Sequence, residues 1–183
     1  MTVIWILAGI VVLAGVFLAV TYNRLVSHRN RVENGWSQID VQLRRRTDLV
    51  PNLVESVRGY AAHERETFQA VTEARAQIGR ARTVEQRAEA ENVLTAALGR
   101  LLAVAEAYPE LRATEQFQDL QRQLADIEQK LAVSRQVYND TVLTYETARE
   151  TFPTNLLAGM LGFGPREYFE VEGAAREAPQ VRF

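Results

Sequence analysis

The first twenty residues contain no charged residue, no histidine and no side-chain amide. Residues 2–20 read TVIWILAGIVVLAGVFLAV, an almost continuous run of apolar side chains. At a rise of about 1.5 Å per residue, a helix of this length spans roughly 30 Å, which is the thickness of the hydrocarbon core of a bilayer. Trp5 and Tyr22 lie near its two ends, where aromatic rings prefer the headgroup level. The sequence therefore predicts a transmembrane anchor over residues 1–22.

A cleaved signal peptide is the alternative interpretation of this stretch. Such a peptide needs basic residues before its apolar part and a cleavage site with small residues after it. Nothing basic precedes the run, and LAVT at residues 18–21 fits a cleavage site poorly. We therefore expect the anchor to be retained.

Basic residues gather on the C-terminal side of the anchor. Residues 21–46 hold six arginines and two acidic residues, whereas residues 47–183 carry a net charge of −6. Because positive charge close to a membrane span stays on the cytoplasmic side, we expect a single-pass protein whose C-terminal domain is cytoplasmic. The same arginines are expected to attract anionic membrane lipid.

Composition excludes several classes of site. The chain has no cysteine, which excludes disulfides, thiolate metal sites and cysteine-bound iron–sulfur clusters. A net charge of −2 over 183 residues argues against a nucleic-acid partner. The mean hydropathy of −0.17 resembles that of a soluble domain, but it averages the anchor with 163 more polar residues.

Helix is the expected structure after the anchor. Gly, Pro and Ser are sparse from residue 24 to 151, and no alternation typical of a strand occurs. Apolar residues recur at steps of three and four over residues 32–78, 84–108 and 117–152. The exceptions at such positions are Arg46, Glu64, Thr67, Glu91, Ser134 and Thr141. This spacing is typical of helices that pack side by side. We expect an all-α fold: a single N-terminal transmembrane helix followed by an elongated antiparallel helical bundle over residues 23–151.

Local signals predict where these helices end. Thr83 follows a Gly-containing segment and can be the N-cap of the second long helix, with Gln86 at the capping-box position. Pro109 ends that helix, Thr114 can cap the next one, and Pro153 stops it.

Pro51 leaves two alternatives open. Its nitrogen cannot donate to the carbonyl of Thr47, so it kinks or breaks a helix. The heptad phase continues across Pro51 and no glycine marks a turn there. These features favour one long helix that runs from the membrane to about residue 79 with a kink near Pro51. The domain would then contain three long helices. A turn with Asp48 as N-cap would instead give four helices.

Residues 152–169 form an apolar C-terminal segment that contains Leu156, Met160 and Phe163. With three long helices it would be a docking patch far from the membrane, and with four it would be an element at the membrane interface. Its side chains could also simply cover the open end of the bundle core. The composition of residues 170–183 predicts disorder.

Motifs for catalysis are sparse. HERE at residues 63–66 resembles the start of a zinc-binding motif, but Thr67 stands where the second histidine would be. Phosphate-binding loops, dinucleotide motifs and serine-nucleophile motifs are absent from the sequence. We therefore expect no enzymatic activity, no cofactor and no metal site.

A long block at residues 36–54, WSQIDVQLRRRTDLVPNLV, resembles the signature of the LemA family, and AVAEAYPEL at residues 103–111 and Phe152-Pro153 extend the similarity. The resemblance covers about residues 20–170. It implies a bacterial protein with one transmembrane helix and a helical bundle, and no established catalytic residues. It also implies a link to membrane organisation, because some relatives take part in magnetosome membrane biogenesis and the genes often lie near membrane zinc proteases.

We accordingly expect a non-enzymatic scaffold at the bacterial inner membrane that oligomerises or organises partners. The alternative is an adaptor or regulator of a membrane protease or another envelope complex. The expected partners are membrane lipid, further copies of the chain and a membrane protease or other membrane protein. The candidate interaction residues are Gly9, Gly15, Trp36, Arg44, Arg45, Arg46, Leu156, Met160 and Phe163.

Overall fold

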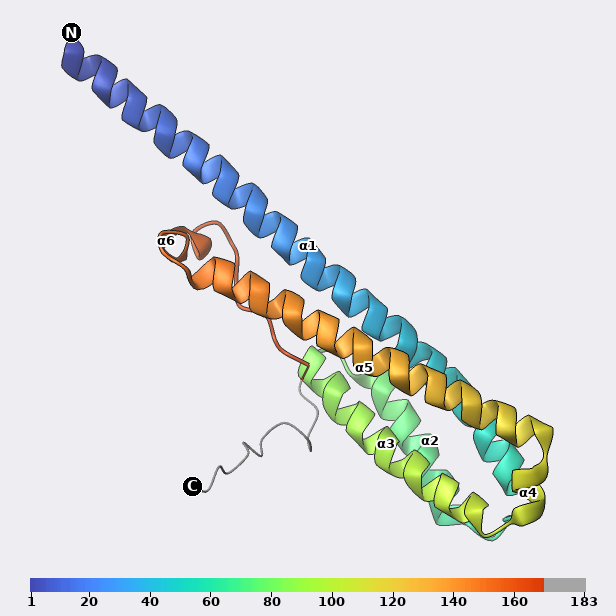
Figure 1. Ribbon diagram of the computed structural model, residues 1–183. Coiled ribbons are helices and arrows are strands. Elements are labelled where there is room, and N and C mark those ends of the chain that lie inside the picture. The colour runs from blue at the N-terminus through green and yellow to red at the C-terminus, as the bar shows by residue number, and fades with distance from the viewer. Residues whose placement is uncertain (170–183) are drawn as a thin grey trace, which may run out of the picture. The chain divides into compact units, whose positions relative to one another are not determined.

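The computed structural model describes residues 1–169, and every regular element in that part of the chain is an α-helix (Figure 1). In chain order these are α1 (Thr2–Arg58), α2 (Arg65–Arg80), α3 (Val84–Glu106), α4 (Pro109–Ala113), α5 (Glu115–Glu150) and α6 (Asn155–Ala158). The all-α prediction is confirmed. The disorder expected for residues 170–183 concerns residues outside the described ones.

Two units make up the described chain. The first comprises Met1–Ser37 and Val137–Arg166, and the second comprises Gln38–Gln136 together with residues 167–169. Helices α1 and α5 each contribute one part to the first unit and another to the second.

Helix α1 continues through Pro51 without a break, as the heptad phase predicts. The ring removes the N–H that would have bonded to the carbonyl of Thr47, four residues earlier. Arg75 of α2 replaces this donor, since its Nε lies 2.7 Å from the Thr47 carbonyl oxygen. A turn with Asp48 as N-cap is therefore wrong.

The extension of this first helix to residue 79 is also wrong, because α1 ends at Arg58 and α2 begins at Arg65. Gly59, a poor helix former, follows the last helical residue. The turn then places the fully buried Ala61 in the core, and its N–H bonds to the carbonyl of Val57 at 2.9 Å. The second unit consequently has four long helical segments, but the additional break lies at residues 59–64 and not at Pro51.

The core of the second unit is built from the positions that the heptad pattern selects. It combines Leu53 and Val57 of α1, Val71 of α2, Leu94 of α3 and Phe117 of α5, all buried. The three segments α1, α2 and α3 lie beside the N-terminal half of α5 in Figure 1. Helix α3 starts with the predicted capping box of Thr83 and Gln86, and the Thr114 hydroxyl accepts a hydrogen bond from the Phe117 N–H at 3.3 Å.

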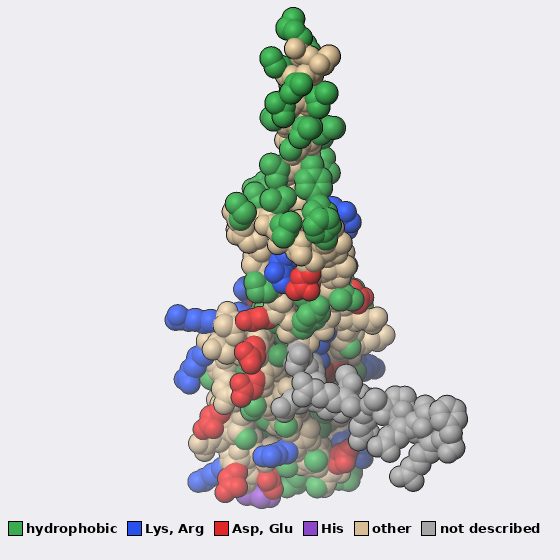
Figure 2. Space-filling view, turned by 90° about the vertical axis from the view of Figure 1, so that its left-hand side faces the viewer, with side chains coloured by type: hydrophobic (Ala, Val, Ile, Leu, Met, Phe, Trp, Pro, Cys, Tyr) green, Lys and Arg blue, Asp and Glu red, His purple; other side chains and the backbone are tan. Residues whose placement is uncertain are grey.

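The first unit pairs the N-terminal part of α1 with the C-terminal part of α5. Their backbones approach closely at Gly35, where an added Cβ would lie 3.3 Å from the Cα of Tyr138. Leu25, Val32 and Tyr145 are buried in this unit. The apolar stretch of α1 makes no such contacts: all its residues to Val20 are exposed (Figure 2), and α1 is long and apolar enough to cross a membrane.

Candidate functional site

A groove lies in the first unit where the apolar stretch of α1 ends. It has a volume of about 540 Å³ and takes its walls from α1, from the last two turns of α5 and from the turn that follows α5. We call it the anchor groove; its lining residues are Phe17, Val20, Thr21, Arg24, Leu25, His28, Leu143, Thr144, Thr147, Ala148, Thr151, Phe152, Pro153 and Thr154.

The lining of the anchor groove changes in character along α1. Phe17 and Val20 supply an apolar wall, whereas Arg24 and His28 supply nitrogen donors one and two turns further from the anchor. The Nδ1 atom of His28 is buried and has no hydrogen-bond partner among the described residues. Burial and the positive charges of Arg24 and Arg31 lower the pKa of His28, so that its imidazole is neutral at pH 7.

The apolar C-terminal segment is attached beside this groove. Phe163 is buried, its ring packs edge-on against Tyr22 at 5.6 Å, and the guanidinium of Arg29 lies 5.4 Å from the ring centre. The Tyr145 hydroxyl donates to the carbonyl of Gly164 at 2.7 Å. The segment therefore lies next to the end of the anchor, and the docking patch far from the membrane is excluded.

Its other apolar residues remain outside the packing. Leu156 is 64% exposed and Met160 is 84% exposed, and both belong to the same short segment as Phe163. Of these three side chains, Phe163 is packed as expected of a residue that covers the core, whereas Leu156 and Met160 are not. Phe152, which borders the anchor groove, is likewise exposed.

The three consecutive arginines have three different environments. Arg44 is exposed and pairs with Asp40 at 2.8 Å, and Arg45 is exposed beside Asp48. Arg46 is 1% exposed, so it is unavailable for the outside contact that we expected of it. A residue in the next heptad position after Leu43 faces the core, which explains why Arg46 differs from its neighbours.

Arg46 belongs to an ion cluster inside the second unit. Its Nη1 lies 2.5 Å from Oε1 of Glu91 and 3.0 Å from the hydroxyl of Thr95, and its Nη2 pairs with Glu128. Arg135 contacts the same Glu91 oxygen at 2.5 Å. Two positive and two negative charges therefore meet between α1, α3 and α5.

Glu128 is the member of the ion cluster whose pKa is shifted by burial. Burial of its carboxylate, assisted by the negative charge of Glu91, raises the pKa of Glu128, although Arg46 and Arg135 act in the opposite direction. The sequence analysis did not identify this cluster. Its signal was the presence of Arg46 and Glu91, of opposite charge, at heptad positions that should be apolar.

The remaining candidates lie apart from one another. Trp36 is half-buried against the ring of Tyr138, 5.8 Å away, which is the packing role of a core residue. Gly9 and Gly15 are exposed, and an added Cβ would meet nothing within 4 Å at either position. Because six residues turn a helix by 600°, these two glycines lie about 120° apart and do not share one face.

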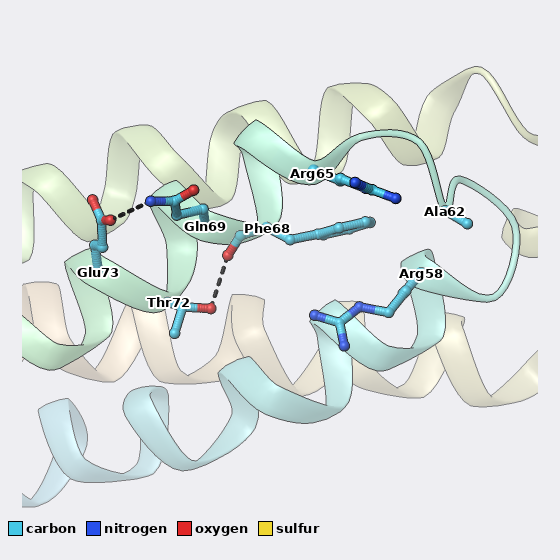
Figure 3. A pocket seen from close by; sticks show the side chains of 7 residues that line it. All are labelled: Arg58, Ala62, Arg65, Phe68, Gln69, Thr72 and Glu73. Atoms are coloured by element: carbon cyan, nitrogen blue, oxygen red, sulfur yellow. Dashed lines mark hydrogen bonds between the residues drawn. The ribbon is translucent and has the colours of Figure 1, made fainter.

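A second, open pocket of about 570 Å³ lies where α1 ends and α2 begins (Figure 3). Phe68 lies between the side chains of Arg58 and Arg65, with the Arg58 guanidinium 5.3 Å from the ring centre. Nearby, Nε2 of His63 lies 3.3 Å from the Tyr108 hydroxyl. Within residues 1–169 no group of three or more acidic or histidine side chains is arranged to hold a metal ion.

Comparison with known proteins places this architecture in a family. The magnetosome proteins MamQ 1 and MamQ 2 of Paramagnetospirillum magneticum are each 28% identical to it over 192 residues, covering 90% of this chain and 70% of theirs. Protein LemA of Metamycoplasma hominis is 24% identical over 144 residues, covering 76% of this chain and 64% of that protein. These similarities and the apolar N-terminal helix are consistent with a membrane-associated helical protein. The sequence profile of the LemA family matches residues 35–183, and the chain belongs to that family.

Proposed function

We propose that this protein is a non-enzymatic scaffold, held in the bacterial inner membrane by residues 1–22, that associates with further copies of itself through its helical domain in the cytoplasm. The observation that carries the proposal is the continuity of α1, which extends without a break from the exposed apolar stretch to core residues such as Leu53. The apolar anchor and residues of the packed core therefore belong to one helix, and no linker separates them.

Exposed apolar side chains outside the anchor support the association. Val133 is 57% exposed and Val137 is 42% exposed, and a spacing of four residues places them on one face of α5. Val41 of α1 is exposed as well. Apolar side chains that a monomer leaves in water are available for contact with another copy.

The absence of cysteine from the sequence makes a clean experiment feasible. Full-length variants Val133→Cys and Val137→Cys are produced separately in bacterial membranes and oxidised. We expect a disulfide-linked dimer for each, because the introduced cysteine is the only thiol of each variant. Gly99→Cys, at an exposed position of α3, is the control and should remain monomeric.

Three results would speak against this scaffold. A monomer at every position, together with a monomeric mass in detergent at all concentrations, would refute self-association. A stoichiometric cross-link to a different membrane protein would favour the adaptor alternative. Labelling of the cysteines by a membrane-impermeant maleimide in intact spheroplasts would contradict the cytoplasmic orientation.

A further inference from the structure

We propose that the anchor groove binds the headgroup of an anionic phospholipid. The inference rests on the membrane anchoring proposed above, but it does not depend on self-association. Four features of the first unit support it. They are the position of the groove along α1 relative to the end of the apolar stretch, the order of the side chains that line it, an unpartnered histidine nitrogen and the local balance of charge.

The level of the anchor groove follows from the length of the anchor. The apolar stretch ends at Val20, so the hydrocarbon layer ends close to this residue. Arg24 lies four residues further along α1, which is about 6 Å along the helix axis. The headgroup layer extends by roughly 5–8 Å on each side of the hydrocarbon, so Arg24 lies at the depth of the lipid phosphates.

The lining matches the order of groups in a phospholipid. Phe17 and Phe152 border the groove on the membrane side and are both exposed, as a wall against an acyl chain would be. Threonine hydroxyls follow, including that of Thr147, and they can bond to ester and glycerol oxygens. The Arg24 guanidinium is suited to a phosphate because it offers two parallel donors.

His28 supplies an independent indication of a ligand. Its Nδ1 is buried without a hydrogen-bond partner in the described chain, and it belongs to a side chain that lines the groove. A buried nitrogen that lacks a partner is costly, whereas a phosphate oxygen or a glycerol hydroxyl would supply the missing bond. The imidazole can serve either partner by exchanging its tautomer.

The charge around the groove favours an anion. Arg24 and Arg31 form no ion pair within residues 1–169, and both add to the positive potential at His28. The nearby acidic residues of α5 are already engaged, because Glu146 and Glu150 both pair with Arg149 at 2.6 and 2.7 Å. An anionic lipid therefore meets a positive field, and the zwitterionic lipids that surround it gain less from the same contact.

The test uses purified full-length protein in vesicles that contain phosphatidylglycerol and phosphatidylcholine in equal amounts. A photoreactive benzoylphenylalanine replaces Leu143, which lines the groove and is 56% exposed. After illumination, mass spectrometry of the protein counts adducts of each lipid. We expect adducts of phosphatidylglycerol to exceed those of phosphatidylcholine by about fivefold, the preference that one basic residue confers.

Two variants and one control locate the binding. Arg24→Gln should abolish most of the preference, and Thr147→Trp, which fills the groove and leaves every charge in place, should reduce all lipid adducts. Arg31→Gln removes the same charge from the same helix two turns further along, at a residue that does not line the groove, and it should reduce the preference much less than Arg24→Gln does. Resistance of each variant to carbonate extraction shows that the anchor remains inserted.

Defined outcomes would overturn the proposal. Equal labelling of the two lipids would show that the groove has no preference for an anionic headgroup. An equal loss in Arg24→Gln and Arg31→Gln would show only general attraction to an anionic surface. Adducts with a second copy of the chain at Leu143 would show that protein covers the groove. Loss of carbonate resistance in the unmodified protein would instead refute the anchoring itself, so the two failures are distinguishable.

Discussion

Removal of Glu91 should destabilise the second unit strongly. In Glu91→Leu, Arg46 keeps its buried position but loses the carboxylate that lies 2.5 Å from its Nη1. Two unit charges about 4 Å apart attract each other by about 4 kcal/mol at an effective dielectric constant of 20. Measured losses on removing one partner of a buried pair are about 3–5 kcal/mol. Here Arg46 and Arg135 would be left with the single negative charge of Glu128, so one positive charge remains without compensation.

Thermal unfolding of the full-length protein in detergent, followed by circular dichroism at 222 nm, provides the assay. A domain of this size loses about 2–4 °C in Tm per kcal/mol, so Glu91→Leu should lower Tm by about 6–20 °C. Asp126→Asn is the control, since the Asp126–Lys130 pair is exposed on α5. Such a pair contributes about 0.3–0.5 kcal/mol, and Tm should change by no more than about 2 °C.

A double variant tests the reasoning itself. Arg46→Met combined with Glu91→Leu removes one charge of each sign and leaves Arg135 near Glu128. If charge compensation is what matters, the double variant should be more stable than the sum of the two single effects predicts, by about 1–3 kcal/mol. Additivity within about 0.5 kcal/mol would refute the account, because it would mean that each side chain acts independently.

Three other predictions follow from the packing of the helices and from the surroundings of His28. Arg75→Met should lower the free energy of unfolding by about 1 kcal/mol in the native sequence. It should lower it much less in a chain that also carries Pro51→Ala, because alanine restores the backbone donor to α1. Equal losses in the two backgrounds, measured by denaturant unfolding, would contradict this role. Gly35→Leu should destabilise the protein by about 1–3 kcal/mol, because the backbone of α5 lies too close for a larger side chain. Gly99→Ala, in open space on α3, should stabilise the protein by about 0.5–1 kcal/mol. Denaturant unfolding measures both changes. The imidazole of His28 should titrate below pH 6.5 by NMR, because burial and the nearby arginines lower its pKa in the folded state. Its contribution to stability is therefore present above that pH and is lost as the pH falls. A titration midpoint above 6.5 would contradict this account of its surroundings.

Local features of the sequence predicted much of the fold. The capping box of Thr83 and Gln86 depends on residues three apart, and the heptad positions of Leu53 and Leu94 depend on spacing within one helix. The break after Arg58 was missed because the apolar phase resumes after the turn. Glu64, which interrupted that phase, was a signal of the break.

The site residues were harder to predict because their partners are distant in the sequence. Arg46 and Glu91 are 45 positions apart, and nothing in the run of three arginines distinguishes the buried one from Arg44. The anchor groove needs the end of α5 to lie beside the end of the anchor, and this depends on how many times the chain reverses direction. Gly9 and Gly15 were grouped by residue type, although helix geometry separates them.

The uninterrupted passage of α1 out of its apolar stretch has a rotational consequence within the first unit. Each residue of a helix is rotated by about 100° from the one before it. The direction in which Gly9 faces around the helix axis therefore fixes the direction in which His28 faces. Inserting one residue between Val20 and Arg24 would twist one against the other by about 100°, and inserting seven would restore the original register to within about 20°. Any neighbour that selects a side of the membrane helix thereby also selects where the groove opens.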